Sequence, residues 1–157
     1  MSDDTTDAQT RSKRPTPNPA LARLEAFVGT WQWEASLEGK PIGRGPTEFS
    51  WQESGVFLVE HAGAEQPEFP SSTAIFGCDD TTETYCMIQV DSRGISRIYQ
   101  MSLREGVWKF WRDAPGFFQR FEGRFSNDGT TISGRCEKSA DGVQWELDFD
   151  LTYTKVG

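Results

Sequence analysis

The chain offers few side chains that could carry out covalent chemistry. Its only histidine is His61, and a nucleophilic triad needs a base of that type. No Gly-x-Ser-x-Gly motif occurs that would hold a nucleophilic serine. Asp79, Asp80 and Glu83 fall in a predicted turn, where acidic residues are common as turn formers. We therefore assign no catalytic residue and predict no metal ion and no cofactor.

A second group of residues is better suited to binding than to catalysis. Polar and sulfur-containing side chains occur among aromatic ones, and an apolar cavity with a few placed polar groups is typical of a small-molecule site. Arg97 would favour an anionic ligand through charge-assisted hydrogen bonds. The predicted ligand-binding residues are Trp51, His61, Tyr85, Met87, Gln89, Arg97, Tyr99, Met101 and Trp111. The alternative is a filled core in which Arg97 stacks on Trp31 or is neutralised by Asp91.

Turn motifs predict the framework that would position these residues. Between Gly94 and Gly142 a glycine-closed turn recurs every ten to thirteen residues, and the intervening segments are rich in β-branched and aromatic residues. Such strands form an antiparallel meander, which closes into a barrel or packs as a sandwich. We predict ten strands, at about 30–37, 46–52, 55–61, 72–78, 84–91, 95–103, 106–112, 117–125, 131–138 and 144–155.

The register of the central hairpin decides which residues share a face. Asp91 and Gly94 favour a type I turn with a glycine bulge, which pairs Asp91 with Ile95. That register places six residues on one face, namely Tyr85, Met87, Gln89, Arg97, Tyr99 and Met101. A two-residue loop would instead put Cys86, Ile88 and Val90 on the face of Tyr99, because a one-residue slip inverts every assignment. We favour the first register.

The last strand shows the clearest alternation. Its apolar positions are Trp145, Leu147, Phe149, Leu151 and Tyr153, and Asp148 and Asp150 lie between them. Alternation of this kind is typical of a strand with one buried and one solvated face. We expect the five apolar side chains to point into the barrel.

The N-terminal region divides into a tail and a helix. Residues 1–17 are polar and contain two prolines, so we predict a disordered tail, followed by one barrel domain over 18–157. Asn18 is a good N-cap, Pro19 suits the first helical position and Gly29 is placed to end the helix. We expect this short helix to lie across the mouth of the barrel, and the proline-containing loop 62–71 to form a mobile rim.

Composition excludes several classes of partner. The net charge of −8 argues against nucleic acid, because phosphate binding depends on a basic face. No apolar run reaches the length of a membrane span, and the acidic start does not resemble a secretory signal. The odd count of three cysteines fits reduced thiols. We therefore predict a cytoplasmic protein.

Aromatic residues on both faces of neighbouring strands indicate an interface. They are Trp108, Phe110, Trp111, Phe117 and Phe118. Contiguous exposed aromatics usually mark a contact surface. We therefore predict a homodimer through residues 106–125.

Gly29-Thr30-Trp31, which follows the predicted helix and opens the first strand, resembles the Gly-x-Trp signature of lipocalins and calycins. The segment Ile75–Tyr85 resembles the strand–turn–strand of bacterial lipocalin-like domains of unknown function, related to nitrobindins and fatty-acid-binding proteins. The resemblance covers about residues 20–156. It implies an all-β, ten-stranded, up-and-down calycin-like barrel, in which Gly29 and Trp31 are structural and Trp31 packs across the floor against a basic side chain.

One departure from this resemblance bears on haem. Nitrobindins hold haem through a histidine near the C-terminus, whereas residues 145–156 contain none. We therefore expect no haem binding by that route.

Together these patterns predict a barrel that binds a small hydrophobic or amphipathic molecule, possibly an anionic one, without covalent chemistry. Two alternatives stay open. One is an enzyme on the same barrel, such as a cyclase or isomerase, which a single buried acid–base residue would favour. The other is an interaction module whose barrel is filled.

Overall fold

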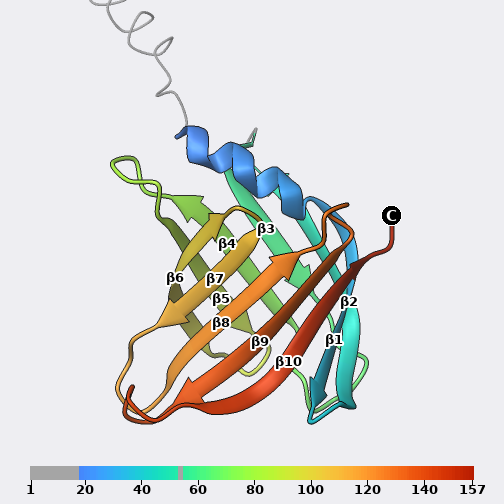
Figure 1. Ribbon diagram of the computed structural model, residues 1–157. Helices are drawn as coiled ribbons and strands as arrows, with labels where there is room; N and C mark the ends of the chain where they lie inside the picture. The colour runs from blue at the N-terminus through green and yellow to red at the C-terminus, as the bar shows by residue number, and fades with distance from the viewer. Residues whose placement is uncertain (1–17, 53–54) are drawn as a thin grey trace, which may run out of the picture.

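The computed structural model describes residues 18–52 and 55–157, so the predicted tail over 1–17 lies outside the described residues. The described strands pair in chain order, and the first also pairs with the last, so the sheet closes into one antiparallel barrel (Figure 1). The strands are β1 (Gly29–Leu37), β2 (Lys40–Gln52), β3 (Phe57–Ala62), β4 (Ser72–Cys78), β5 (Tyr85–Asp91), β6 (Ser96–Arg104), β7 (Val107–Arg112), β8 (Phe118–Phe125), β9 (Thr131–Ser139) and β10 (Glu146–Lys155). This confirms the predicted all-β, up-and-down, calycin-like barrel.

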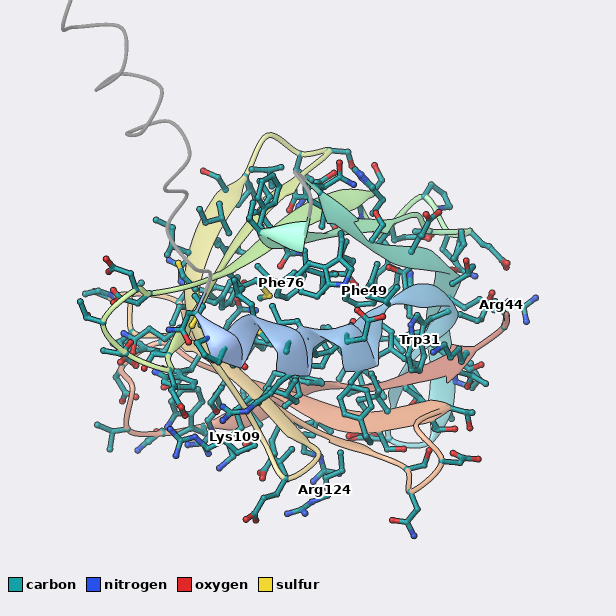
Figure 2. The ribbon with its side chains drawn as sticks, turned by 90° about the horizontal axis from the view of Figure 1, so that it is seen from above. Trp31, Arg44, Phe49, Phe76, Lys109 and Arg124 are labelled. Atoms are coloured by element: carbon teal, nitrogen blue, oxygen red, sulfur yellow. The ribbon has the colours of Figure 1, made fainter. Side chains whose placement is uncertain are left out.

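A short helix closes one end of the barrel. It is a 3₁₀ helix, η1 (Pro19–Phe27), and the Asn18 side chain caps it by accepting a hydrogen bond of 3.0 Å from the backbone N–H of Ala20. Figure 2 shows η1 lying across the barrel end. Its residues Leu21, Leu24 and Phe27 are buried against the core of the barrel. The predicted helix is confirmed, although it ends at Phe27 rather than at Gly29.

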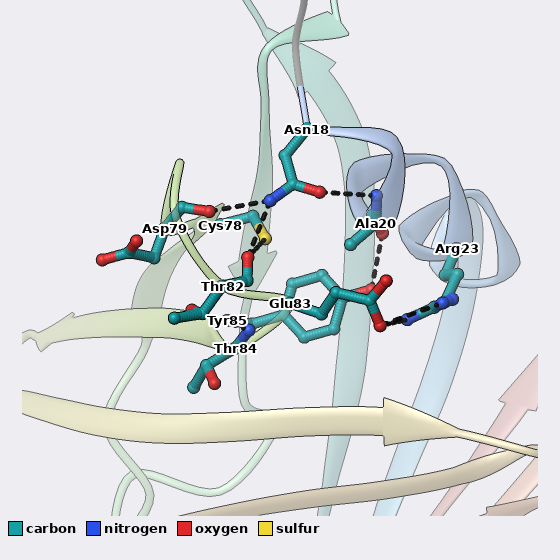
Figure 3. A network of polar contacts seen from close by, with 9 residues as sticks. All are labelled: Asn18, Ala20, Arg23, Cys78, Asp79, Thr82, Glu83, Thr84 and Tyr85. Carbon is teal, nitrogen blue, oxygen red and sulfur yellow. Dashed lines mark hydrogen bonds and ion pairs between the residues drawn. The ribbon is translucent and has the colours of Figure 1, made fainter.

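Polar contacts tie η1 to the turn between β4 and β5 (Figure 3). The Asn18 side-chain amide donates to the backbone carbonyls of Asp79 and Thr82, at 2.8 and 2.7 Å. Arg23 pairs with Glu83 at 3.3 Å. The hydroxyl of Tyr85 donates to the carbonyl of Ala20 inside the barrel. The helix is therefore fixed to the barrel at its N-terminal end, on both the outer and the inner side.

Trp31 holds the other end of the helix. Its side chain is fully buried, and its indole N–H donates to the carbonyl of Phe27 at 2.8 Å. The Lys155 ammonium lies 5.3 Å from the centre of the Trp31 ring, which is the basic partner that the resemblance implies. Gly29 has a φ of 134°, which side-chain-bearing residues rarely adopt, and a Cβ there would lie 3.0 Å from the Lys155 side chain.

The second strand is longer than the sequence indicates, because it starts at Lys40 rather than near residue 46. Glycine and proline disfavour strands, so the sequence does not predict the first half of β2, which contains both residue types. Gly43 and Gly45 face the interior and leave room for the loop after β3. A Cβ on Gly45 would lie 2.2 Å from the carbonyl oxygen of Gly63, and one on Gly43 would lie 2.4 Å from the Phe69 ring.

The loop 63–71 is attached to the first two strands. The Trp33 indole N–H donates to the carbonyl of Gly63 at 2.7 Å, and the Trp33 and Phe69 rings are 5.4 Å apart. Arg44 forms an ion pair of 2.8 Å with Glu65. The predicted rim of the barrel is therefore a loop folded against β1 and β2, and its mobility stays a prediction.

The central hairpin adopts the favoured register. The Asp91 N–H donates to the carbonyl of Ile95 at 3.0 Å, and Gly94 bonds back to Asp91 at 2.9 Å. Met87 pairs with Tyr99, and Gln89 pairs with Arg97, as the turn predicts.

The last strand departs from its simple alternation. A bulge between Leu147 and Phe149 shifts the register against β9. Phe149 and Tyr153 keep the predicted inward face, but Trp145 lies outside, with the Arg120 guanidinium 4.0 Å from its ring centre. The expectation that all five apolar residues point inward is wrong, because the extra residue at the bulge inverts the faces before it.

The aromatics of residues 106–125 are divided unequally between the faces. Trp108 is buried and packs against the Phe110 and Phe121 rings at 5.3 and 4.9 Å. Trp111 lies on the opposite, outer face of β7. The interior therefore takes up much of the apolar surface on which the homodimer prediction was based.

A candidate ligand-binding cavity

A cavity of about 450 Å³ occupies the barrel interior at the end away from η1. Aromatic residues form much of its inner wall, and polar residues lie near its opening. Its lining includes Trp33, Glu60, Glu68, Phe69, Met87, Gln89, Asp91, Arg93, Arg97, Tyr99, Trp108, Phe110, Phe117, Gln119, Lys138, Asp148, Phe149 and Tyr153. The helix end is filled instead by a core that includes Phe27, Phe49 and Phe76.

Four of the predicted ligand-binding residues line this cavity, namely Met87, Gln89, Arg97 and Tyr99. They come from one face of the β5–β6 hairpin, where cross-strand pairing brings Gln89 beside Arg97. The Tyr99 hydroxyl donates to the side-chain oxygen of Gln119 at 2.6 Å. Burial raises the pKa of Tyr99, with Arg97 opposing it, so the hydroxyl stays neutral.

The Arg97 charge has no acidic partner within ion-pair distance among the described residues. Its guanidinium lies 4.7 Å from the centre of the Phe117 ring. Asp91 instead pairs with Arg93 at 2.8 Å, and the hydrogen bond from Arg93 lowers the pKa of that carboxyl. Neither filled-core role suggested for Arg97 is observed, since Asp91 does not neutralise it and Trp31 stacks with Lys155.

A second arginine lies near this group. Arg112 shares the inward-facing positions of β7 with Phe110, and it pairs across strands with Gln119. Its Nε atom is buried and has no hydrogen-bond partner in the described part of the chain. Two guanidinium groups thus flank the Tyr99–Gln119 hydrogen bond.

The inner part of the cavity contains a carboxyl group, Glu60 from β3. Its side chain is only 9% exposed, and the Thr47 hydroxyl donates to it at 3.1 Å. Burial raises the pKa of Glu60 to about 7, and the Thr47 hydrogen bond opposes the rise. Burial, and to a smaller extent the charge of Glu60, raise the pKa of Tyr153. This cavity therefore holds a proton-exchanging group near neutral pH.

The remaining predicted ligand-binding residues lie elsewhere. Tyr85 and Met101 are buried in the core under η1, and Trp51 donates from its indole N–H to Glu25 of that helix. His61 is exposed on the outer face of β3, where its ring nitrogen contacts Thr73 at 3.2 Å. Trp111 is also on the outer face. The structure therefore does not place these five side chains at the cavity.

Sequence reasoning missed Glu60 and Gln119 as cavity residues. Glu60 follows three apolar residues, Phe57, Leu58 and Val59, so the sequence does not show which face of β3 is buried. Arg112 does not line the cavity, but its alternation with Trp108 and Phe110 indicates an inward-facing position beside it. No local signal identifies Gln119, whose role depends on pairing between β7 and β8.

The described residues contain no cluster of three or more histidine, cysteine or acidic side chains that could hold a metal ion. None of their helices has the length and apolar character needed to cross a membrane.

Solved structures with the same fold include two informative neighbours. The crystal structure of Rv2717c from M. tuberculosis matches with a TM-score of 0.65 at 15% identity, covering 90% of this chain and all of that one. Fatty-acid-binding protein 1 of Echinococcus granulosus matches with a TM-score of 0.57 at 14% identity, over 85% of this chain and 99% of the other. No protein-family model and no curated protein matches the chain. The likeness establishes a calycin-type barrel.

Proposed function

We propose that the protein binds a small amphipathic molecule inside the barrel, with an anionic group of the ligand directed toward Arg97. The observation that carries this proposal is Arg97, a cation without an acidic partner among the described residues, which lies at the wall of a cavity partly lined by aromatic rings. A partly buried guanidinium is stabilised by an anion, and its planar donors suit carboxylate or sulfonate. Arg112 does not line the cavity, but it adds a second positive charge near Tyr99 and so supports the same polarity. The named fatty-acid-binding neighbour supports ligand binding in a barrel of this kind.

Two fluorescent probes of the same skeleton test this proposal. Anilinonaphthalene sulfonate is anionic, and N-phenylnaphthylamine is its neutral parent, so the pair differs by the sulfonate alone. We expect micromolar binding of both. Arg97→Met should weaken the anionic probe by about tenfold, which corresponds to about 1.4 kcal/mol, and leave the neutral probe within about twofold.

Arg124→Met is the matched control, because Arg124 is exposed on β8 and lies 3.9 Å from Glu122 rather than at the cavity. It should leave both affinities unchanged. An equal loss of both probes in Arg97→Met would show that Arg97 acts through packing alone. Failure of both probes to bind wild-type protein would favour the filled-barrel alternative.

The wider setting of this function is also proposed. Residues 18–157 would act as one barrel domain, and the free thiols of Cys78, Cys86 and Cys136 support a cytoplasmic location. A homodimer through residues 106–125 would use the outward-facing Trp111 and Phe118.

A further inference from the structure

Among the described residues, Glu60 is the almost fully buried acidic side chain at the cavity wall that has no cationic partner, whereas the similarly buried side chain of Asp91 pairs with Arg93. Thr47 donates to its Oε2 atom, and no described residue donates to Oε1. Tyr153, only 7% exposed, lines the same cavity, and its hydroxyl has no hydrogen-bond partner among the described residues. Two polar atoms in the inner part of the cavity are thus available to a ligand.

No cation of the described residues neutralises this carboxyl. The inward neighbours of Glu60 on the adjacent strands are Thr47, Phe49 and Ala74, none of them charged. Tyr153 and Cys136 are the titratable groups across the cavity, and both have raised pKa values that keep them neutral. The other charged residues of the lining are Glu68, Asp91, Arg93, Arg97, Lys138 and Asp148, of which Asp91 is about as buried as Glu60, with a side chain 6% exposed. Asp91 pairs with Arg93, and Asp148 lies 3.8 Å from Lys138.

The inner walls are aromatic. Trp33, Trp108, Phe110, Phe149 and Tyr153 line the cavity that Glu60 enters. Aromatic faces attract cations, more strongly where water is excluded. A carboxylate removed from water is costly on its own and is stabilised by a cation that reaches it. A protonated amine can form an ion pair with the carboxylate and a cation–π contact with the aromatic walls, whereas a neutral ligand group can form neither.

We propose that Glu60 is the binding site for a protonated amine at the inner end of the ligand, with Tyr153 and the aromatic walls around it. This rests on the proposed function only in requiring that the cavity admit a ligand. It adds the chemical class of the inner group: an ammonium that enters first, with the remainder of the molecule toward Arg97. The ligand class is then an amphipathic amine, including one that bears an acidic group at its other end.

A matched pair of probes tests the proposal. Dansylcadaverine carries a primary ammonium at the end of a five-carbon chain, and dansyl-hexylamide replaces that ammonium with a methyl group. We expect the amine to bind wild-type protein about tenfold more tightly than the neutral probe at about pH 8. The preference should decrease below about pH 7 as Glu60 takes up its proton, because the ammonium is attracted to the ionised form.

Glu60→Gln keeps the shape of the side chain and an oxygen that can accept from Thr47. It should remove both the amine preference and its pH dependence, while the neutral probe still binds. Glu68→Gln is the control, since Glu68 lines the same cavity but is exposed at its opening. It should retain the preference.

The outcomes separate this inference from the proposed function. Equal binding of the two probes to wild-type protein, or an amine preference that survives in Glu60→Gln, would overturn the inference and leave the anion proposal intact. Affinity for the amine that falls as pH rises through 7 would overturn it as well. If no dansyl or naphthalene probe enters the barrel, both proposals are wrong.

Discussion

At the scale of single residues, Glu60 makes folding depend on pH. Burial raises the pKa of Glu60 in the folded protein to about 7, whereas the ordinary pKa of a glutamate carboxyl is 4.5. Between these values the folded state binds one proton more than the unfolded chain. The stabilising contribution is therefore complete below about pH 4.5 and is lost as pH rises through 7, with a total on the order of 3 kcal/mol.

Glu60→Gln should abolish this contribution. We expect the free energy of unfolding of wild type, relative to the variant, to fall by about 3 kcal/mol between about pH 5 and pH 8, with the variant the more stable protein at pH 8. Urea unfolding of both proteins across this range measures the difference and cancels the titration of surface carboxyls. Parallel stability curves would show that Glu60 is not buried in the unpaired form described above.

The predicted residue His61 and its neighbour Glu60 illustrate what sequence reasoning reaches at this scale. Adjacent residues of a strand point to opposite faces. The chemistry of histidine favoured His61, but the burial of Leu58 places the even-numbered side chains of β3 inside. Met87, Gln89, Arg97 and Tyr99 could be predicted as neighbours because one local turn fixes their register.

At the scale of elements, local turn chemistry predicts most strands, and long-range packing explains the differences. The first half of β2 is concealed by Gly43 and Gly45, whose purpose is clear only when the loop 63–71 lies against them. The β10 bulge depends on pairing with β9, and no residue type within β10 predicts it. Cross-strand and loop contacts of this kind leave no periodic signal within a single segment.

Gly45→Ala should destabilise the barrel by about 1–3 kcal/mol, because its Cβ would meet the backbone of Gly63, which cannot rotate away as a side chain can. Gly77→Ala in β4 is the control, since a Cβ there meets nothing within 4 Å. We expect it to stay within about 0.5 kcal/mol of wild type. Thermal or urea unfolding measures both, and equal stability would show that the loop adjusts freely.

The junction of η1 and β1 gives another prediction. Trp31→Ala removes a fully buried ring and the hydrogen bond to Phe27, so we expect a loss of about 3–5 kcal/mol or insoluble protein. Trp111→Ala, on the outer face of β7, should cost less than about 1 kcal/mol. Similar denaturant midpoints for Trp31→Ala and wild type would contradict the role of the Gly29-Thr30-Trp31 motif.

At the scale of the whole molecule, self-association stays a prediction that the outer face can test. Wild type should sediment as a dimer at tens of micromolar, roughly the concentration that a modest interface requires. Trp111→Glu should shift it to monomer, because the charge would lie within the proposed contact. Ile42→Glu alters a 39% exposed residue on β2, which lies across the barrel from β7, and should not. Monomeric wild type, or dissociation by Ile42→Glu instead, would exclude an interface at residues 106–125.

The helix η1 covers one end of the barrel (Figure 2), and the described cavity lies at the other. Phe27 packs directly on Phe49 and Trp108, at 5.2 and 4.8 Å, so the described residues under η1 form a filled aromatic core. If ligands enter and leave only by the open end, a second ligand cannot enter until the bound ligand has left. If the cavity is used as proposed, exchange of one ligand for another must be dissociative: the rate at which a bound probe leaves should not depend on how much competitor is added. The residence time of the bound ligand would then be governed by the loop 63–71 and not by the concentration of competing ligand.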